Sequence, residues 1–134
     1  MTYPVPIVPG LLPAFGIVLM TLGPAPAVPA DEAVLAKGER VFRNQCRGCH
    51  SLTPGTHIAG PSLHGVVGRN AGEVEGFKYS RVLQASRLVW TPEVLDRFLA
   101  DPDALLPGTR MVFWGLPEDA RRPLIEYLRH VGQQ

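Results

Sequence analysis

The residues best suited to chemistry stand together in the pentapeptide Cys46-Arg47-Gly48-Cys49-His50. Cys46 and Cys49 are the only two cysteines among the 134 residues, and the histidine follows the second one directly. Two thiols one helical turn apart can each add to one vinyl group of a single porphyrin, and the adjacent imidazole then lies beneath the ring and coordinates its iron. The spacing therefore predicts one covalently attached haem, with His50 as an axial ligand of the iron.

Three other uses of a Cys-x-x-Cys pair compete with this interpretation. A redox disulfide of the thioredoxin kind needs a βαβ context. No stretch of the sequence alternates between apolar and polar residues for long enough to predict a sheet. A zinc site needs about four ligands, whereas the two cysteines and His50 supply three. A plain structural disulfide stays open for an oxidising compartment. Taken with the rest of the chain, the pattern favours haem.

An iron that carries electrons needs a second protein ligand, and the sequence points to Met111. If the chain is cleaved after Ala30, Met111 is the only methionine left. A thioether suits ferrous iron, and a Met/His ligand pair raises the reduction potential. Met111 follows a Pro-Gly-Thr turn, which does not resemble the apolar stripe of a core helix. The competing ligands are His57, His64 and His130.

The elements that must position these residues are helical. Residues 31–45 predict a helix with one apolar face, on which Gly38 is costly for the helix but lets another helix cross closely. A second clear helix begins at Thr91-Pro92 and ends at Pro102. The final helix is expected to begin near Arg122, because Pro123 then falls in its first turn.

Between the helices the chain is expected to be irregular. Residues 51–78 form a glycine-rich loop, residues 79–86 a short helix and residues 103–116 a second loop. A structureless stretch as long as 51–78 is unusual in a compact domain. We expect it to wrap around something that is not peptide.

Composition divides the chain into two parts. Residues 1–30 contain no charged residue and seven of the 14 prolines, and their apolar core has the length of a signal-peptide core. They are predicted to be a signal peptide cleaved after Ala30 or a retained N-terminal anchor, although no basic residue opens them. Residues 31–134 form one domain. The net charge of +1 argues against nucleic-acid binding.

In its motifs and their order, residues 31–134 resemble class I cytochrome c, especially mitochondrial cytochrome c and short bacterial soluble cytochromes c. The resemblance rests on Gly38 and Phe42, the Cys46-to-His50 motif, Gly60-Pro61 through Arg69, Gly76 to Tyr79, Trp90, Pro107 to Gly115 and Leu124 to Leu128. It implies an all-α fold of three to five helices, with long loops around one covalent haem and crossing N- and C-terminal helices.

The resemblance also implies site roles. Pro61 would accept a hydrogen bond from His50 through its carbonyl and so orient the ring. Arg69, Tyr79 and Trp90 would pair with a buried haem propionate. Thr109 would support the Met111 side. The chain departs from the family at Leu83 and Phe98, where polar groups are usual, which predicts a drier pocket and a shifted reduction potential.

The implied function is one-electron transfer by a monomer and not catalysis. Redox proteins would dock transiently at the haem edge, where Arg43 and Arg110 would steer acidic partners. Both belong to a thin cationic fringe whose other candidates are Arg47, Lys78, Arg81 and Arg87. The expected location is the periplasm, with membrane attachment only if residues 1–30 are retained. Two alternatives stay open: a haem subunit of a dehydrogenase or oxidase, and a haem peroxidase or gas sensor with a displaceable ligand.

Overall fold

The computed structural model describes residues 30–134, so the predicted signal peptide or anchor falls outside the described residues except for Ala30. The chain forms helices joined by long loops, with one isolated β-bridge between Asn70 and Val89 and no longer strand in the described part. The elements are α1 (Ala30–Val41), a π-helical turn η1 (Phe42–Cys46), α2 (Arg81–Ala85), α3 (Pro92–Ala100), α4 (Pro102–Leu105) and α5 (Glu118–Val131). The predicted all-α class is confirmed. None of these helices is long and apolar enough to cross a bilayer.

The helix predicted over 31–45 continues through η1, and its last turn is wider than an α-turn. The Arg47 N–H donates to the Phe42 carbonyl at 2.9 Å, which spans five residues. The N–H groups of Cys49 and His50 then both donate to the Cys46 carbonyl, at 3.0 and 2.9 Å. A π-turn is rare and is frequently found at functional sites. Here it leads directly into the Cys-x-x-Cys-His motif.

Two short-range caps define α3 and α4. The Thr91 hydroxyl accepts the Val94 N–H at 3.3 Å, and Pro92 occupies the first turn of α3, as predicted. The Asp101 carboxylate likewise accepts the Ala104 N–H at 3.0 Å and starts α4. The prediction of an unbroken loop over 103–116 is therefore wrong at its start. Pro102 ends one helix and also opens the next, because proline suits a first helical position.

The predicted start of the last helix near Arg122 is also wrong. Helix α5 begins at Glu118, which leaves Pro123 inside the helix. A proline there removes one backbone hydrogen bond. The helix persists because its apolar face is well buried: Leu124 is fully covered, and Ile125 and Leu128 are nearly so. Tertiary packing outweighs local preference at this point.

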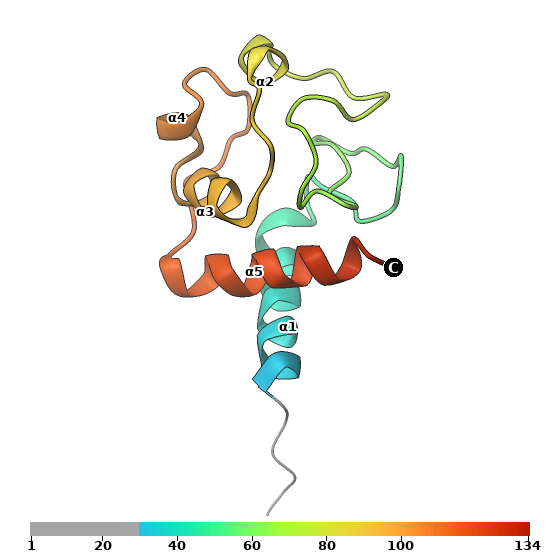
Figure 1. The fold of residues 1–134 in the computed structure, drawn as a ribbon, viewed down its shortest axis with the longest axis vertical. Helices are drawn as coiled ribbons and strands as arrows, with labels where there is room; N and C mark the ends of the chain where they lie inside the picture. Colours follow the sequence, from blue (N-terminus) through green and yellow to red (C-terminus); the bar gives the residue numbers. More distant parts are fainter. Residues whose placement is uncertain (1–29) are drawn as a thin grey trace, which may run out of the picture.

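Helix α5 crosses α1 in the lower half of the molecule, as Figure 1 shows. Gly38 lies at the crossing: a Cβ atom there would collide with the Pro123 carbonyl and lie 2.6 Å from the Cβ of Tyr127. Beside it, the rings of Phe42 and Tyr127 pack with their centres 6.0 Å apart. The predicted crossing of the terminal helices is confirmed. It requires a residue without a side chain at position 38.

We expect Gly38→Ala to destabilise the haem-loaded protein by about 1–3 kcal/mol, the usual cost of overpacking. Helix propensity alone predicts the opposite, because alanine is favoured over glycine by about 1 kcal/mol. Urea unfolding followed by circular dichroism measures the difference. Glu39→Ala, at an exposed neighbouring position, is the matched control and should change stability by less than about 0.5 kcal/mol. A Gly38→Ala variant more stable than the wild type would contradict the close crossing.

Candidate haem site

A large cavity opens between the loops, α3 and α5. Its volume is about 580 Å³, within the usual range for a cofactor or drug-sized ligand. Most of its lining side chains are apolar, including Val66, Leu95 and Leu128. Eight of the nine predicted site residues line it, namely Cys46, Cys49, His50, Pro61, Arg69, Tyr79, Trp90 and Met111. Residues spread over more than 60 positions of the chain thus meet at one cavity.

The ninth predicted residue, Thr109, does not line the cavity. Its hydroxyl accepts the Met111 N–H at 3.5 Å, a long hydrogen bond within the same turn. Thr109 therefore contacts the backbone that carries Met111 and not the cavity itself.

The two cysteines are free thiols at one wall of the cavity, Cys46 buried and Cys49 exposed. Burial, with a smaller contribution from Cys49, raises the pKa of the Cys46 thiol to about 11. Within residues 30–134 no group of three or more His, Cys, Asp or Glu side chains could hold a metal ion.

His50 is held in one orientation. Its Nδ1 lies 2.8 Å from the Pro61 carbonyl. A carbonyl can only accept, so Nδ1 carries the proton and the lone pair of Nε2 stays free for a metal. Burial lowers the pKa of His50, which the hydrogen bond to Pro61 opposes. The neutral imidazole, the form that binds a metal, is therefore favoured.

Gly60 makes this orientation tighter. A Cβ atom on Gly60 would lie 2.7 Å from the Nδ1 of His50 and would overlap the imidazole ring. The Gly60 N–H donates to the Cys49 carbonyl at 2.7 Å, which ties the loop back to the cysteine motif. The backbone of residue 60 thus packs directly against the ring of the predicted ligand.

Arg69 is a partly buried cation without a carboxylate partner among the described residues. Its guanidinium donates to the carbonyls of His64 and Ser62, at 2.8 and 3.1 Å, but its Nε is buried without a partner. Burial lowers the pKa of Arg69, an effect that Tyr79 opposes. A buried cation of this kind is costly until an anion reaches it.

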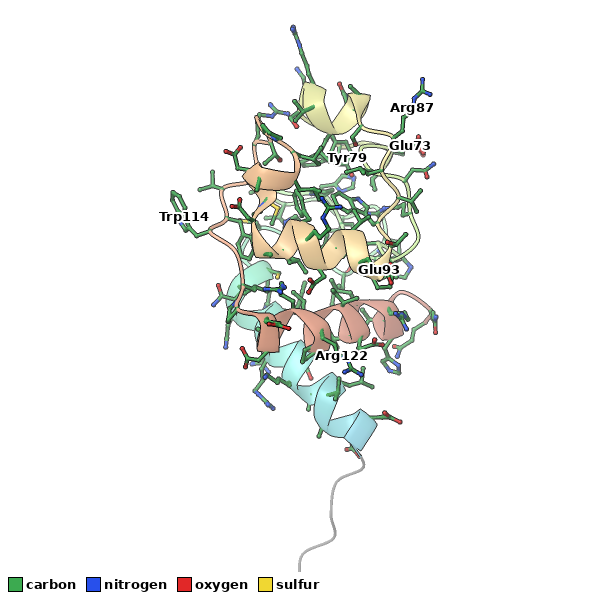
Figure 2. All side chains as sticks on the ribbon, turned by 60° about the vertical axis from the view of Figure 1, so that its left-hand side comes forward. Glu73, Tyr79, Arg87, Glu93, Trp114 and Arg122 are labelled. Carbon is green, nitrogen blue, oxygen red and sulfur yellow. The ribbon has the colours of Figure 1, made fainter. Side chains whose placement is uncertain are left out.

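Trp90 lies beside Arg69 because their backbones are paired. The Trp90 N–H donates to the Arg69 carbonyl at 2.9 Å, and the Gly68 N–H donates to the Trp90 carbonyl at the same distance. Tyr79 also lines the cavity, and Figure 2 labels it just below α2. Burial raises the pKa of Tyr79, which the charge of Arg69 opposes. Its hydroxyl therefore remains a hydrogen-bond donor at neutral pH.

Ser80 also belongs to the cavity wall, although no sequence pattern indicated it. Its hydroxyl is buried, lines the cavity and has no hydrogen-bond partner. A buried hydroxyl without a partner is uncommon, and Ser80 follows directly on Tyr79 in the cavity wall. A serine in a loop carries no sequence signal, so only the structure could identify it.

The residues present fit a haem. Two thiols and an oriented imidazole lie at one part of an apolar cavity. The unpartnered Nε of Arg69 and the hydroxyl of Ser80 would suit the carboxylates of the same group. The two residues that depart from the family pattern have different positions. Phe98 lines the cavity, and the centres of its ring and the Trp90 ring lie 4.9 Å apart. Leu83 packs against the core and does not line the cavity.

Comparison with known proteins gives the same result. The family model described as Cytochrome c matches residues 35–132. Cytochrome c2 of Blastochloris viridis is 40% identical over 117 residues, covering 86% of this chain and 89% of that protein. Cytochrome c 2.1 of Caenorhabditis elegans is 43% identical over 93 residues, covering 69% and 84%. Cytochrome c-550 of Ancylobacter novellus is 43% identical over 99 residues, covering 70% and 92%. The chain therefore belongs to the cytochrome c family, with one haem attached through Cys46 and Cys49.

Proposed function

We propose that this protein is a one-electron carrier whose iron keeps two protein ligands, His50 and Met111, throughout its cycle. When bound, the haem supplies the couple between ferrous and ferric iron. The observation that carries the proposal is the fixed imidazole: the Nδ1 of His50 lies 2.8 Å from the Pro61 carbonyl, so its Nε2 is ready to bind a metal. Ligands that stay in place keep the cost of reorganisation small when an electron arrives or leaves.

Met111 is the proposed sixth ligand. It is half-buried and lines the same cavity as His50, and its backbone N–H donates to Thr109. Among the cavity-lining residues of the described chain, His50 is the only histidine. His57 is engaged elsewhere: the Ser62 N–H donates to its Nδ1 at 3.0 Å, and its Nε2 lies 2.9 Å from the Glu75 carbonyl. These contacts favour Met111 over the histidine alternatives.

Arg69, Tyr79 and Trp90, with Ser80 added, are the proposed partners of a haem propionate. Each of them lines the cavity, and the first and the last present buried polar atoms without partners. An anion held there would be compensated by the Arg69 charge and by hydroxyl donors. This part of the chain would hold the cofactor and exclude water, with no role in moving protons.

The enzyme and sensor alternative is less well supported by the cavity. A peroxidase needs acid–base groups beside an open iron position. Met111 lines the cavity with its chain neighbours Val112 and Phe113, as do the apolar residues of α3, and Arg110 and Lys78 are the exposed cations of the lining. No second histidine accompanies those cations in the described lining. We therefore propose a carrier and not a catalyst.

We further propose that the protein acts as a monomer in the periplasm, after removal of residues 1–30, and docks transiently with redox proteins. The charge-free stretch of that leader supports export. Of the two arginines expected to steer acidic partners, Arg43 lies 4.0 Å from Glu39, whereas Arg110 has no carboxylate partner among residues 30–134. Arg110 is the better candidate for steering. A haem subunit bound permanently to a larger enzyme would share these features, and co-purification distinguishes it.

The optical spectrum of the reduced protein tests the ligand pair. We expect carbon monoxide to leave the wild-type spectrum unchanged, because His50 and Met111 would both stay bound to the iron. Met111→Leu should open one position, so that carbon monoxide shifts the spectrum. His64→Ala and His130→Ala are the controls and should behave like the wild type. Binding of carbon monoxide to the wild type would contradict the carrier proposal and favour a sensor or an enzyme.

Phe98→Tyr should shift the reduction potential, because it places a hydroxyl in the wall of the cavity that Met111 also lines. A hydrogen bond worth about 1 kcal/mol corresponds to about 40 mV for one electron. The matched control is Tyr127→Phe, which changes one hydroxyl at the α1–α5 crossing outside the cavity. Spectroelectrochemical titration measures both variants. Equal potentials for Phe98→Tyr and the wild type would show that the missing hydroxyl has no effect.

Arg69→Met should destabilise the haem-loaded protein by about 3 kcal/mol, because a buried carboxylate would lose its counter-charge. Arg97→Met, at an exposed position of α3, is the control and should cost less than about 0.5 kcal/mol. Arg69→Lys should recover part of the loss, since it restores the charge but not the bidentate geometry. Denaturant unfolding of the three haem-loaded variants measures the series. Equal stabilities for Arg69→Met and Arg97→Met would contradict the propionate role.

A further inference from the structure

The face beside the cavity mouth carries a tryptophan that the described chain leaves uncovered. Trp114 is 96% exposed, and Val112, two residues before it, is 89% exposed. Figure 2 shows Trp114 projecting outward from the segment that leads to α5. A large aromatic side chain in this position exposes apolar area that a folded protein usually covers. Such exposure next to a functional cavity is typical of an interaction site.

The backbone that presents Trp114 is fixed. Buried and exposed side chains alternate along residues 111–114. Met111 and Phe113 are half-buried, whereas Val112 and Trp114 are exposed. The Leu116 N–H donates to the Leu99 carbonyl at 2.8 Å, and the side chain of Leu116 is buried. Gly115, at φ +92°, passes so close to the Ala100 carbonyl that a Cβ atom would collide with it. Binding at Trp114 therefore needs little ordering of the backbone.

The mouth of the cavity, which Val112 shares, carries two cations. Arg110 and Lys78 are exposed and line the cavity mouth together with Val112. The Arg110 guanidinium donates to the Lys78 carbonyl at 2.8 Å, which holds the two residues together, and neither forms an ion pair within residues 30–134. The two carboxylates of α4 and its cap accept backbone N–H groups: Asp101 accepts from Ala104, and Asp103 accepts the Gly108 N–H at 3.2 Å.

We propose that Trp114 is the anchor by which this protein binds its redox partner. The partner's docking face would offer an apolar recess for the indole, bordered by carboxylates that face Arg110 and Lys78. The inference rests on the proposed electron-carrier function and adds the side chain that sets how long the complex lasts. A few residues carry most of the binding energy of an interface, and tryptophan is enriched among them. Complexes between redox proteins bury little surface area, so one indole would make up a large share of the buried area.

A second copy of this chain fits the same face poorly. Two-fold pairing would place the surface of one protomer against the identical surface of the other. Arg110 and Lys78 would then face the same cations across the interface, and like charges in contact are unfavourable. Charge complementarity therefore favours an acidic protein as the occupant.

The test uses the reduced, haem-loaded protein, with membrane vesicles from the organism that encodes it as the oxidant. Trp114→Ala should raise the concentration needed for half-maximal oxidation by about 10- to 30-fold, mainly through faster dissociation. The dependence of this concentration on KCl should be the same as for the wild type. Arg110→Gln should instead weaken the dependence on KCl. Val89→Ala, at another exposed apolar position, is the control and should match the wild type.

Two further measurements separate the outcomes. Oxidation by hexacyanoferrate(III), a small anion that needs no recess, should proceed equally in Trp114→Ala and the wild type, as should their reduction potentials. If the wild type reacts with neither oxidant, the carrier function itself is refuted. If Trp114→Ala matches the wild type on membrane vesicles, only the anchor is refuted. The anchor proposal is also overturned if the wild type, but not Trp114→Ala, co-sediments with protein-free vesicles of anionic phospholipid, because the patch would then bind lipid.

Discussion

The close contact of α1 and α5 is the constraint on which the rest of the structure depends. One helix leads through η1 into Cys46, and the other supplies Leu124 and Leu128 to the cavity wall. Their crossing therefore fixes the attachment motif relative to the apolar wall opposite the loops. A chain of this size has little core to spare, and much of its interior is a cavity. Without the crossing, the loops would have no base on which to close.

The second requirement is electrostatic. The described chain contains a half-buried arginine with no carboxylate beside it and a buried serine hydroxyl with no partner. Both are unfavourable as long as the protein is considered alone. In the proposed haem site, an anionic carboxylate of the cofactor would compensate both groups. Folding and cofactor binding would then favour each other.

Local signals in the sequence predicted much of this arrangement. The Thr91-Pro92 cap and the apolar face of residues 31–45 depend on neighbours in the chain, and both helices lie close to where they were expected. The start of α5 was missed because proline preference favours a first turn, whereas the buried face of the helix extends the element back to Glu118. Helix α4 was missed because Pro102 can both end and begin a helix. Ser80 was missed because its importance lies in having no partner, which only three-dimensional packing reveals.

The widened turn η1 affects how the residues that follow it are oriented around the helix axis. An α-helix rotates by about 100° per residue. A π-turn takes up one extra residue, so the residues after it keep the orientation that they would have without the extra residue. Gly38 is fixed by the crossing with α5 and Cys46 by the cavity, and η1 lies between these two points. A chain one residue shorter here would return to regular α-geometry with its thiols still at the cavity wall, because η1 takes up the extra residue. The wide turn therefore keeps the attachment motif in register with the helix crossing, and a change of length by one residue between Gly38 and Cys46 can be absorbed there.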